Sequence, residues 1–123
     1  MTQEEKDLVL RDLCARLPYG VKTYYKTAGW EDKYCTISPQ VIDNMLHRSD
    51  VVVKPYLRPT SSMTGEETKN LCDNLDYVLV FGEKFYDKIP EFYDWLNEHH
   101  FDYRGLIEKG LAISTEEFNP YKD

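Results

Sequence analysis

Apolar residues recur at helical spacing in two long stretches of this chain, one near each end. In the first stretch they stand at i, i+3, i+4 and i+7, and they are Leu10, Leu13, Cys14 and Leu17. This spacing puts them on one face of an amphipathic helix. Thr2 and Glu5 have the spacing of a capping box at its start, and Pro18 ends it. The pattern therefore predicts a first helix that packs by its leucine face.

The second stretch, Ile89 to Ile113, is the segment around which we expect the rest of the chain to be organised. Pro90 suits the first turn of a helix, because its φ is fixed and its missing N–H has no partner there. The face that follows is apolar and aromatic, and it consists of Phe92, Trp95, Leu96 and His99. Asp102 is suited to cap a second short helix that ends at Gly110. We expect the rings of this face to point inward.

Alternating and β-rich segments separate these two stretches. Val21 to Lys26 alternates, and Lys33 to Ile37 is a second short β-rich run, so a hairpin is predicted. Val51 to Leu57 is predicted as a strand that Pro55 either confines to an edge or ends, because proline cannot donate to the ladder. Tyr77 to Phe81 is the most strand-like segment of the chain. Gly82 and Glu83 can turn it into Lys84 to Asp87 as a second hairpin.

Two shorter helices complete the expected elements. Ser38 followed by Pro39 begins a short helix that runs to Leu46. Thr64 and Glu67 repeat the capping-box spacing at the start of another. The order of elements predicts an α+β fold: a small antiparallel sheet of two hairpins plus an edge strand, with three to four helices packed on it. We expect a single domain over residues 1–113 and a flexible polar tail over residues 114–123.

The net charge of −7 is unevenly distributed along the chain. Residues 1–62 carry a net charge of +1, whereas residues 63–123 carry −8. An acidic surface repels phosphate backbones, so direct binding of nucleic acid is disfavoured. A protein partner with a basic surface would be attracted instead.

Cysteine usage and hydropathy favour a cytoplasmic protein. The three cysteines, Cys14, Cys35 and Cys72, are an odd number without a CxxC pair, which indicates reduced thiols. We expect Cys14 and Cys72 to pack as small apolar residues on helices. The first twenty residues hold no apolar segment of secretory length, and the longest apolar run is far too short to span a membrane. No cofactor is expected, and the oligomeric state is left open.

The densest group of reactive side chains is His99, His100, Asp102 and Arg104, and these are the candidate catalytic residues. One hypothesis is a small enzyme in which Asp102 orients an imidazole that acts as a general base. A metal site is not predicted, because adjacent histidines on a helix point about 100° apart. The structural interpretation is that His99 completes the apolar face, Asp102 caps the next helix and Arg104 pairs with a carboxylate.

The candidate residues for binding a partner are an acidic stripe and one tryptophan. The stripe consists of Asp87, Glu91, Asp94 and Glu98, which recur at helical spacing. It is either an ordinary solvated face or a surface that imitates nucleic acid and meets a basic groove on another protein. Trp30 lies in the connection of the first hairpin. It either folds back on the core, which is the commoner outcome, or is a contact residue if it is exposed there.

Tyrosines on the predicted strands suggest a third interpretation, a nucleic-acid-binding module. Tyr24, Tyr25, Tyr34 and Tyr56 could form a sheet on which bases stack. Few basic residues accompany them, and no nucleic-acid-binding motif is present. Ordinary β-propensity explains the same tyrosines.

Three blocks of sequence carry a resemblance to a known group. They are DLCARLPYGVK at Asp12 to Lys22, VKPYLRPTSSMT at Val53 to Thr64, and DWLNEHHFDYRGLIEKGLAI at Asp94 to Ile113. The chain resembles small uncharacterised proteins encoded by phages and prophages of gut Bacteroidales. The resemblance implies a phage or prophage accessory protein made in the cytoplasm of a bacterial host cell. Together with the charge, it leads us to expect a non-enzymatic protein that binds a host or phage protein.

Overall fold

The computed structural model describes residues 2–70 and 85–121. Its elements are α1 (Gln3–Arg16), η1 (Leu17–Tyr19), β1 (Lys22–Thr27), β2 (Trp30–Thr36), α2 (Pro39–His47), β3 (Val52–Leu57), η2 (Thr60–Ser62), α4 (Phe85–Glu98) and β4 (Ile113–Ser114). Residues 65–70 are also helical. The α+β class predicted from the sequence is confirmed.

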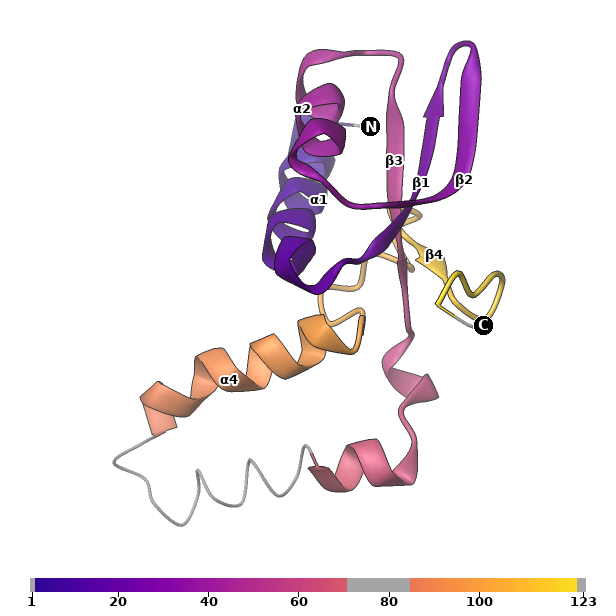
Figure 1. The fold of residues 1–123 in the computed structure, drawn as a ribbon. Helices are drawn as coiled ribbons and strands as arrows, with labels where there is room; N and C mark the ends of the chain where they lie inside the picture. Colours follow the sequence, from indigo (N-terminus) through magenta and orange to yellow (C-terminus); the bar gives the residue numbers. More distant parts are fainter. Residues whose placement is uncertain (1, 71–84, 122–123) are drawn as a thin grey trace.

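The four strands form one sheet in the order β2-β1-β3-β4. β1 is antiparallel to both β2 and β3, so the predicted first hairpin is confirmed. The sheet is mixed rather than purely antiparallel, because β4 runs parallel to β3. α1 and α2 lie side by side on one face of the sheet, and α4 lies beyond one end of it (Figure 1).

β3 lies inside the sheet order rather than at its edge, and Pro55 marks the place where it changes partner. Residues Val52 to Pro55 pair with β1, whereas Tyr56 and Leu57 pair with β4. Proline has no N–H to give to a ladder, so a strand tolerates it best where its pairing is incomplete. The edge prediction therefore identified the constraint at Pro55, but it did not foresee β4.

The predicted second hairpin falls largely outside the described residues, which end at residue 70 and resume at residue 85. Phe85 to Asp87, expected in its second strand, instead form the first turn of α4. The helix thus begins before Pro90, which lies inside it and cannot donate to the carbonyl of residue 86.

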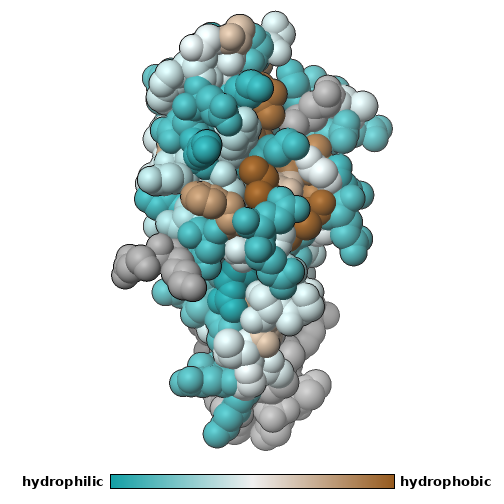
Figure 2. Space-filling view, turned by 90° about the vertical axis from the view of Figure 1, so that its right-hand side faces the viewer, coloured by the Kyte–Doolittle hydropathy of each residue, from teal (hydrophilic) through white to brown (hydrophobic). Residues whose placement is uncertain are grey.

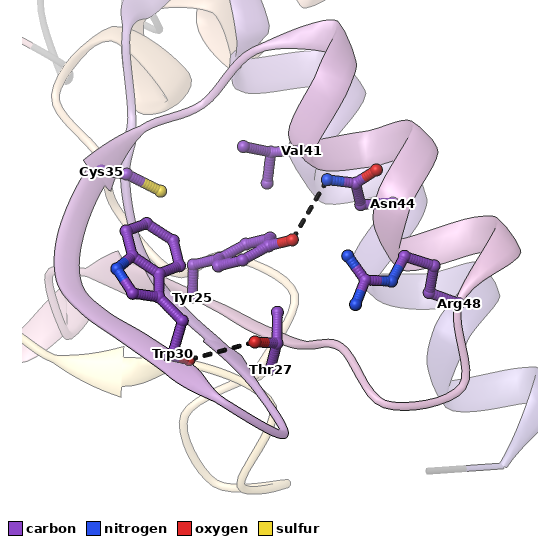
Figure 3. Close-up of a pocket in the computed structure, with 7 residues that line it drawn as sticks. All are labelled: Tyr25, Thr27, Trp30, Cys35, Val41, Asn44 and Arg48. Atoms are coloured by element: carbon purple, nitrogen blue, oxygen red, sulfur yellow. Dashed lines mark hydrogen bonds between the residues drawn. The ribbon is translucent and has the colours of Figure 1, made fainter.

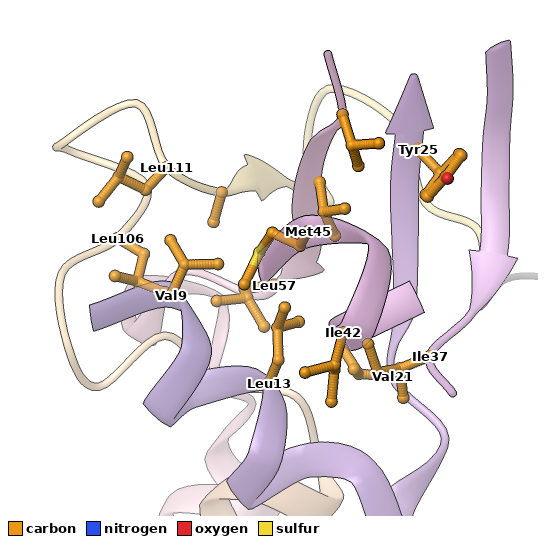
Figure 4. Close-up of a cluster of buried hydrophobic side chains, with 13 residues drawn as sticks. Val9, Leu13, Val21, Tyr25, Ile37, Ile42, Met45, Leu57, Leu106 and Leu111 are labelled. Carbon is orange, nitrogen blue, oxygen red and sulfur yellow. The ribbon is translucent and has the colours of Figure 1, made fainter. Parts of the chain in front are cut away.

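The core fills the space between the two helices and the sheet (Figure 4). Val9 and Leu13 of α1 are fully buried there. α2 contributes Ile42 and Met45, which lie on one face because they are three residues apart. Leu106, from the segment after α4, is also fully buried. The core therefore joins residues from both ends of the chain.

The buried face of α1 differs from the predicted leucine face. The residues that it buries at i, i+3, i+4 and i+7 are Val9, Asp12, Leu13 and Arg16. Cys14 is exposed, so its expected packing as a small apolar residue is wrong. The helix is rotated so that an acid and a base lie inside the protein. Cys72 lies outside the described residues.

Both predicted capping boxes are confirmed, and Ser38 adds a cap that the sequence analysis did not name. The Thr2 hydroxyl accepts from Glu5 N at 3.1 Å, and Thr2 N donates to the Glu5 carboxylate at 2.8 Å. The Ser38 hydroxyl accepts from Val41 N at 3.3 Å at the start of α2. The same reciprocal pair recurs at the helix over residues 65–70, where the two distances are 2.9 and 3.1 Å. Each cap satisfies backbone N–H groups that the helix leaves unpaired.

Two tight turns close the C-terminal region. After α4, Phe101 N donates to Leu96 O and His100 N donates to Asn97 O, which is the Schellman pattern. The residue in the left-handed position there is His100, with φ of 63°. Residues 106–110 form a second such turn that ends at Gly110, so the predicted short helix is wrong. A single closed turn already satisfies the backbone groups of this short segment.

The expected flexible tail contacts the domain over residues 114–121. The Phe118 ring lies 5.9 Å from the Tyr34 ring and 5.5 Å from the Tyr56 ring, measured between centroids. The Tyr121 hydroxyl accepts from Lys22 N at 2.9 Å and donates to Tyr56 O at 2.8 Å. The Tyr121 hydroxyl thus connects the backbone of β1 with that of β3. The tail prediction missed these contacts because each partner is far away in sequence.

Tyr121→Phe tests whether the tail is held in this way. Loss of the hydroxyl leaves Lys22 N–H and Tyr56 C=O without their partner, so we expect a loss of about 1–3 kcal/mol in the free energy of unfolding. The measurement is urea denaturation followed by circular dichroism. Tyr34→Phe is the matched control, because Tyr34 is exposed, and we expect a change within roughly 0.5 kcal/mol. Equal stability of the two variants would mean that the tail is not docked in solution.

Candidate functional site

The two predicted catalytic histidines lie against different aromatic rings. His99 Nδ1 lies 2.9 Å from Trp95 O, and its imidazole stacks on Trp95 with centroids 4.1 Å apart. His100 stacks on Tyr121, also at 4.1 Å. Trp95 is itself half-buried and stacks on Phe101 at 5.8 Å. Each imidazole therefore completes a packed aromatic contact.

Burial lowers the pKa of His100 from 6.5 to about 4, and the positive charge of Arg16 contributes in the same direction. The ring is consequently neutral at physiological pH. Its Nδ1 is buried and has no hydrogen-bond partner in the described part of the chain. A general base must lie within hydrogen-bond reach of the group whose proton it accepts. The His100 ring is instead largely buried and stacked on Tyr121.

Asp102 caps a turn, as the structural interpretation of the cluster expects. Its two carboxylate oxygens accept from Leu106 N at 2.9 Å and from Ile107 N at 3.0 Å. Both oxygens are thus engaged with the backbone that follows. The carboxylate orients this turn, and in the described residues it forms no hydrogen bond with an imidazole.

Arg104, the fourth predicted residue, belongs to a buried ionic network that the sequence analysis missed. Its Nη1 donates to Asp12 Oδ1 at 2.8 Å. Asp12 Oδ2 accepts from Arg16 Nε at 2.8 Å, and Arg16 Nη2 donates to Phe101 O. Asp12 and Arg16 are both fully buried. Their spacing of four residues beside Val9 and Leu13 was the only sequence signal available.

A pocket of about 500 Å³ opens beside this network. It is lined by Ala15, Tyr93, Asn97, Tyr103 and Arg104. The Tyr103 hydroxyl donates to Asn97 Oδ1 at 2.8 Å and accepts from Arg104 Nη1 at 2.9 Å. Three segments meet there, which are α1, α4 and the loop after α4. These hydrogen bonds hold the side chains of Asn97, Tyr103 and Arg104 in place in the lining.

A second pocket, of about 400 Å³, lies between the β1–β2 hairpin and α2. We call it the Trp30 groove, and Figure 3 shows the seven residues that line it: Tyr25, Thr27, Trp30, Cys35, Val41, Asn44 and Arg48. Trp30 is 58 % exposed, whereas the Tyr25 ring beneath it is buried. Aromatic and apolar side chains dominate the lining. Figure 2 shows one face of the molecule, on which apolar side chains gather in the central part.

The Trp30 groove is held by contacts between its own residues. The Tyr25 hydroxyl accepts from Asn44 Nδ2 at 3.1 Å, which joins β1 to α2. The rings of Tyr25 and Trp30 meet edge to face, with centroids 5.6 Å apart. The Thr27 hydroxyl donates to Trp30 O at 3.4 Å at the end of the hairpin. Trp30 is the first residue of β2, whereas the sequence analysis placed it in the connection of the hairpin.

The predicted partner-binding residues do not form one surface. Asp94 and Glu98 are exposed on α4, while the side chains of Asp87 and Glu91 lie outside the described part of that helix. Trp30 begins β2 in the upper part of Figure 1, whereas α4 lies in the lower part. A partner at the Trp30 groove would therefore feel the acidic stripe only through its long-range field.

The strand tyrosines do not form an open stacking platform. Tyr25 and Tyr56 are buried, with 6 % and 3 % of their surfaces exposed. The Tyr24 hydroxyl donates to the Glu31 carboxylate at 2.7 Å, which places negative charge beside it. Tyr34 is 55 % exposed but stacks on Phe118. This arrangement disfavours base stacking along the sheet.

Within residues 2–70 and 85–121, no group of three or more His, Cys, Asp or Glu side chains is arranged to hold a metal ion. In the same ranges, no helix combines the length and the apolar character needed to cross a membrane.

His100→Asn tests the buried imidazole through its pH dependence. The pKa in the folded protein is about 4, below the ordinary value of 6.5. Between these values the unfolded chain binds the proton more readily, so the wild-type protein should lose stability as the pH falls through this window. Asn tolerates the left-handed backbone and does not titrate, so the variant should lack this part of the loss. Urea denaturation at neutral pH and at steps down to about pH 4 measures it.

The difference in unfolding free energy between His100→Asn and the wild-type protein should stay constant above the window, because the imidazole is neutral there in both states. Parallel stability curves through the whole window would contradict the buried, neutral histidine.

Each residue of the predicted cluster thus makes a stacking, backbone or ionic contact. Two pockets, the Trp30 groove and the pocket beside Arg104, are candidate binding sites. No family model, no curated protein and no solved structure matches this chain.

Proposed function

We propose that the protein acts without catalysis, by binding another protein at the Trp30 groove. The observation that carries the proposal is the exposure of Trp30, 58 %, beside a largely apolar pocket of about 400 Å³. Tryptophan in a well-formed pocket is the residue type that most often dominates the energy of a protein interface. More than half of the indole surface is in water, and burial against a partner would remove it from water.

The occupant that fits is a short protein segment with one large apolar side chain and flanking lysines or arginines. The lining contributes one guanidinium, that of Arg48, and Asp50 holds it at 3.2 and 2.8 Å. The groove itself is therefore close to neutral and suits an apolar anchor. The net charge of −7 favours basic flanks, since it attracts them over long distances and speeds association.

The positions of the candidate catalytic residues argue against the enzyme hypothesis. His99, His100 and Asp102 are each engaged in stacking or backbone contacts, and Arg104 pairs with a buried carboxylate. A catalytic site would need some of these groups to converge on a substrate. The burial of Tyr25 and Tyr56 likewise argues against the nucleic-acid-binding hypothesis.

The setting that we propose for this interaction is that of a phage or prophage accessory protein in the bacterial cytoplasm. The sequence resemblance is what supports it, and the acidic C-terminal half is compatible with it. In that setting the partner is a host or phage protein with a basic surface, and the exposed Asp94 and Glu98 of α4 contribute to its attraction.

Trp30→Ala tests the groove. Proteins retained from a bacterial lysate are identified, and the dissociation constant of the tightest partner is then measured by calorimetry for each variant. We expect Trp30→Ala to cost about 2 kcal/mol, roughly a 30-fold rise in Kd. Tyr34→Ala is the matched control, because it removes another exposed ring of β2 that does not line the groove. A partner that binds both variants equally well would refute the groove as the docking site.

Reversing the charge of the acidic stripe tests its steering role separately. In a variant with Asp94→Lys and Glu98→Lys, we expect slower association with the same partner and a weaker dependence of the rate on salt. The dissociation rate should change little, since α4 lies away from the groove. Stopped-flow association at several salt concentrations measures this. An unchanged association rate at low salt would remove the stripe from the mechanism.

A further inference from the structure

We propose that the pocket beside Arg104 binds a small planar organic acid through its carboxylate. The inference is independent of the proposed protein partner, because this pocket and the Trp30 groove share no lining residue. Three features carry it: available donors, an excess of positive charge and an aromatic wall.

The guanidinium of Arg104 is held in place with donors to spare. Nη1 is occupied by Asp12 Oδ1 and the Tyr103 hydroxyl, at 2.8 and 2.9 Å. Among the described residues, Nε and Nη2 donate to no acceptor, and a quarter of the side chain is exposed. These two groups form the edge of the guanidinium that binds a carboxylate in bidentate fashion. Because the side chain is already fixed, binding costs little conformational entropy.

The charge of the buried network is unbalanced. Arg16 and Arg104 share the single carboxylate of Asp12, which leaves an excess of one positive charge. Arg16 Nη1 is buried and has no hydrogen-bond partner in the described part of the chain. Charge in the interior is poorly screened, so a single negative charge at Arg104 would be favourable. A carboxylate supplies that charge, and the exposed Asp94 and Glu98 nearby on α4 disfavour ligands of higher negative charge.

The walls of the pocket suit a planar group behind the carboxylate. Tyr93 is 45 % exposed, and its ring lies 5.2 Å from the Tyr103 ring at an angle of 55°. The Arg104 guanidinium lies 4.6 Å from the centre of the Tyr103 ring, so charge and ring surface are adjacent. Asn97, which is buried and accepts from Tyr103, adds an amide NH₂ to the lining. Ala15 of α1 also lines the pocket, and its side chain fills little of the space because it is a single methyl group.

Benzoate is the probe, with benzamide as its neutral isostere and acetate as the same charge without a ring. Binding is followed by NMR chemical shifts of the backbone amides of the full-length protein. We expect saturable shifts centred on Ala15, Asn97, Tyr103 and Arg104, and binding of benzoate about tenfold or more tighter than that of either comparison compound. Equal binding of benzamide would overturn the role of charge. Absence of saturable shifts up to the solubility limit of benzoate would overturn the site.

Two variants locate the ligand. Arg104→Gln should abolish the preference for benzoate over benzamide. Ala15→Leu fills the pocket from α1 without removing any hydrogen bond, so it should weaken benzoate about tenfold or more even if Arg104→Gln fails to fold. Cys14→Leu is its matched control, an exposed neighbour on the same helix that does not line the pocket. Benzoate binding that survives in Ala15→Leu would overturn the proposal.

Trp30→Ala separates this inference from the proposed function, because it should leave benzoate binding unchanged. Loss of benzoate binding in Trp30→Ala would place the ligand in the Trp30 groove and overturn the assignment to Arg104.

Discussion

One buried carboxylate, that of Asp12, holds the two ends of the fold together. Its two oxygens are taken by Arg16 of the same helix and by Arg104, which lies after α4. Leaving a buried charge unpaired costs about 3–5 kcal/mol. The carboxylate and the guanidiniums must therefore be brought together as the protein folds. That requirement ties α1 to a segment about ninety residues further along the chain.

The consequences of this network extend outward through the backbone. Arg16 also donates to Phe101 O, which fixes the turn that follows α4. Phe101 is bridged to Arg58 just beyond β3, and the Arg58 guanidinium lies 4.1 Å from the centre of its ring. Arg58 binds Glu67 in bidentate fashion, which lowers the pKa of that carboxyl to about 2. A chain of charged and aromatic contacts thus connects α1, the sheet and the segment that begins at Thr64. His100 occupies the left-handed position of the Schellman turn that joins α4 to Phe101.

Local chemistry could be predicted from the sequence, and contacts between distant segments could not. The capping boxes at Thr2 and Thr64 depend on residues three positions apart, so their spacing was sufficient. The face of α1 was mispredicted because two stripes share Leu13, and apolar content favours the one with Leu10 and Leu17. Burial of Asp12 depends on Arg104, which no local pattern connects to it. β4 is only two residues long, and its parallel partner lies far away in sequence. The cluster at residues 99–104 combines both kinds of contact. His99 and Asp102 contact residues four or five positions away. The partners of His100 and Arg104, which are Tyr121 and Asp12, lie far away in sequence.

The separation of the two pockets follows from where the ionic network lies. The pocket beside Arg104 is built on the network itself, so its polar groups are rigid, and a change there also alters the support of the fold. The Trp30 groove is built on the β1–β2 hairpin and α2, where Asn44 and Tyr25 are the polar contact across the groove. Trp30 adds exposed ring surface at the end of that hairpin and takes no part in the buried network. Replacement of the indole should therefore remove only its edge-to-face contact with Tyr25 from the folded protein, about 0.5–1.5 kcal/mol, and leave the ionic network intact. A surface that can change without disturbing the buried network is the kind on which a binding specificity can be built.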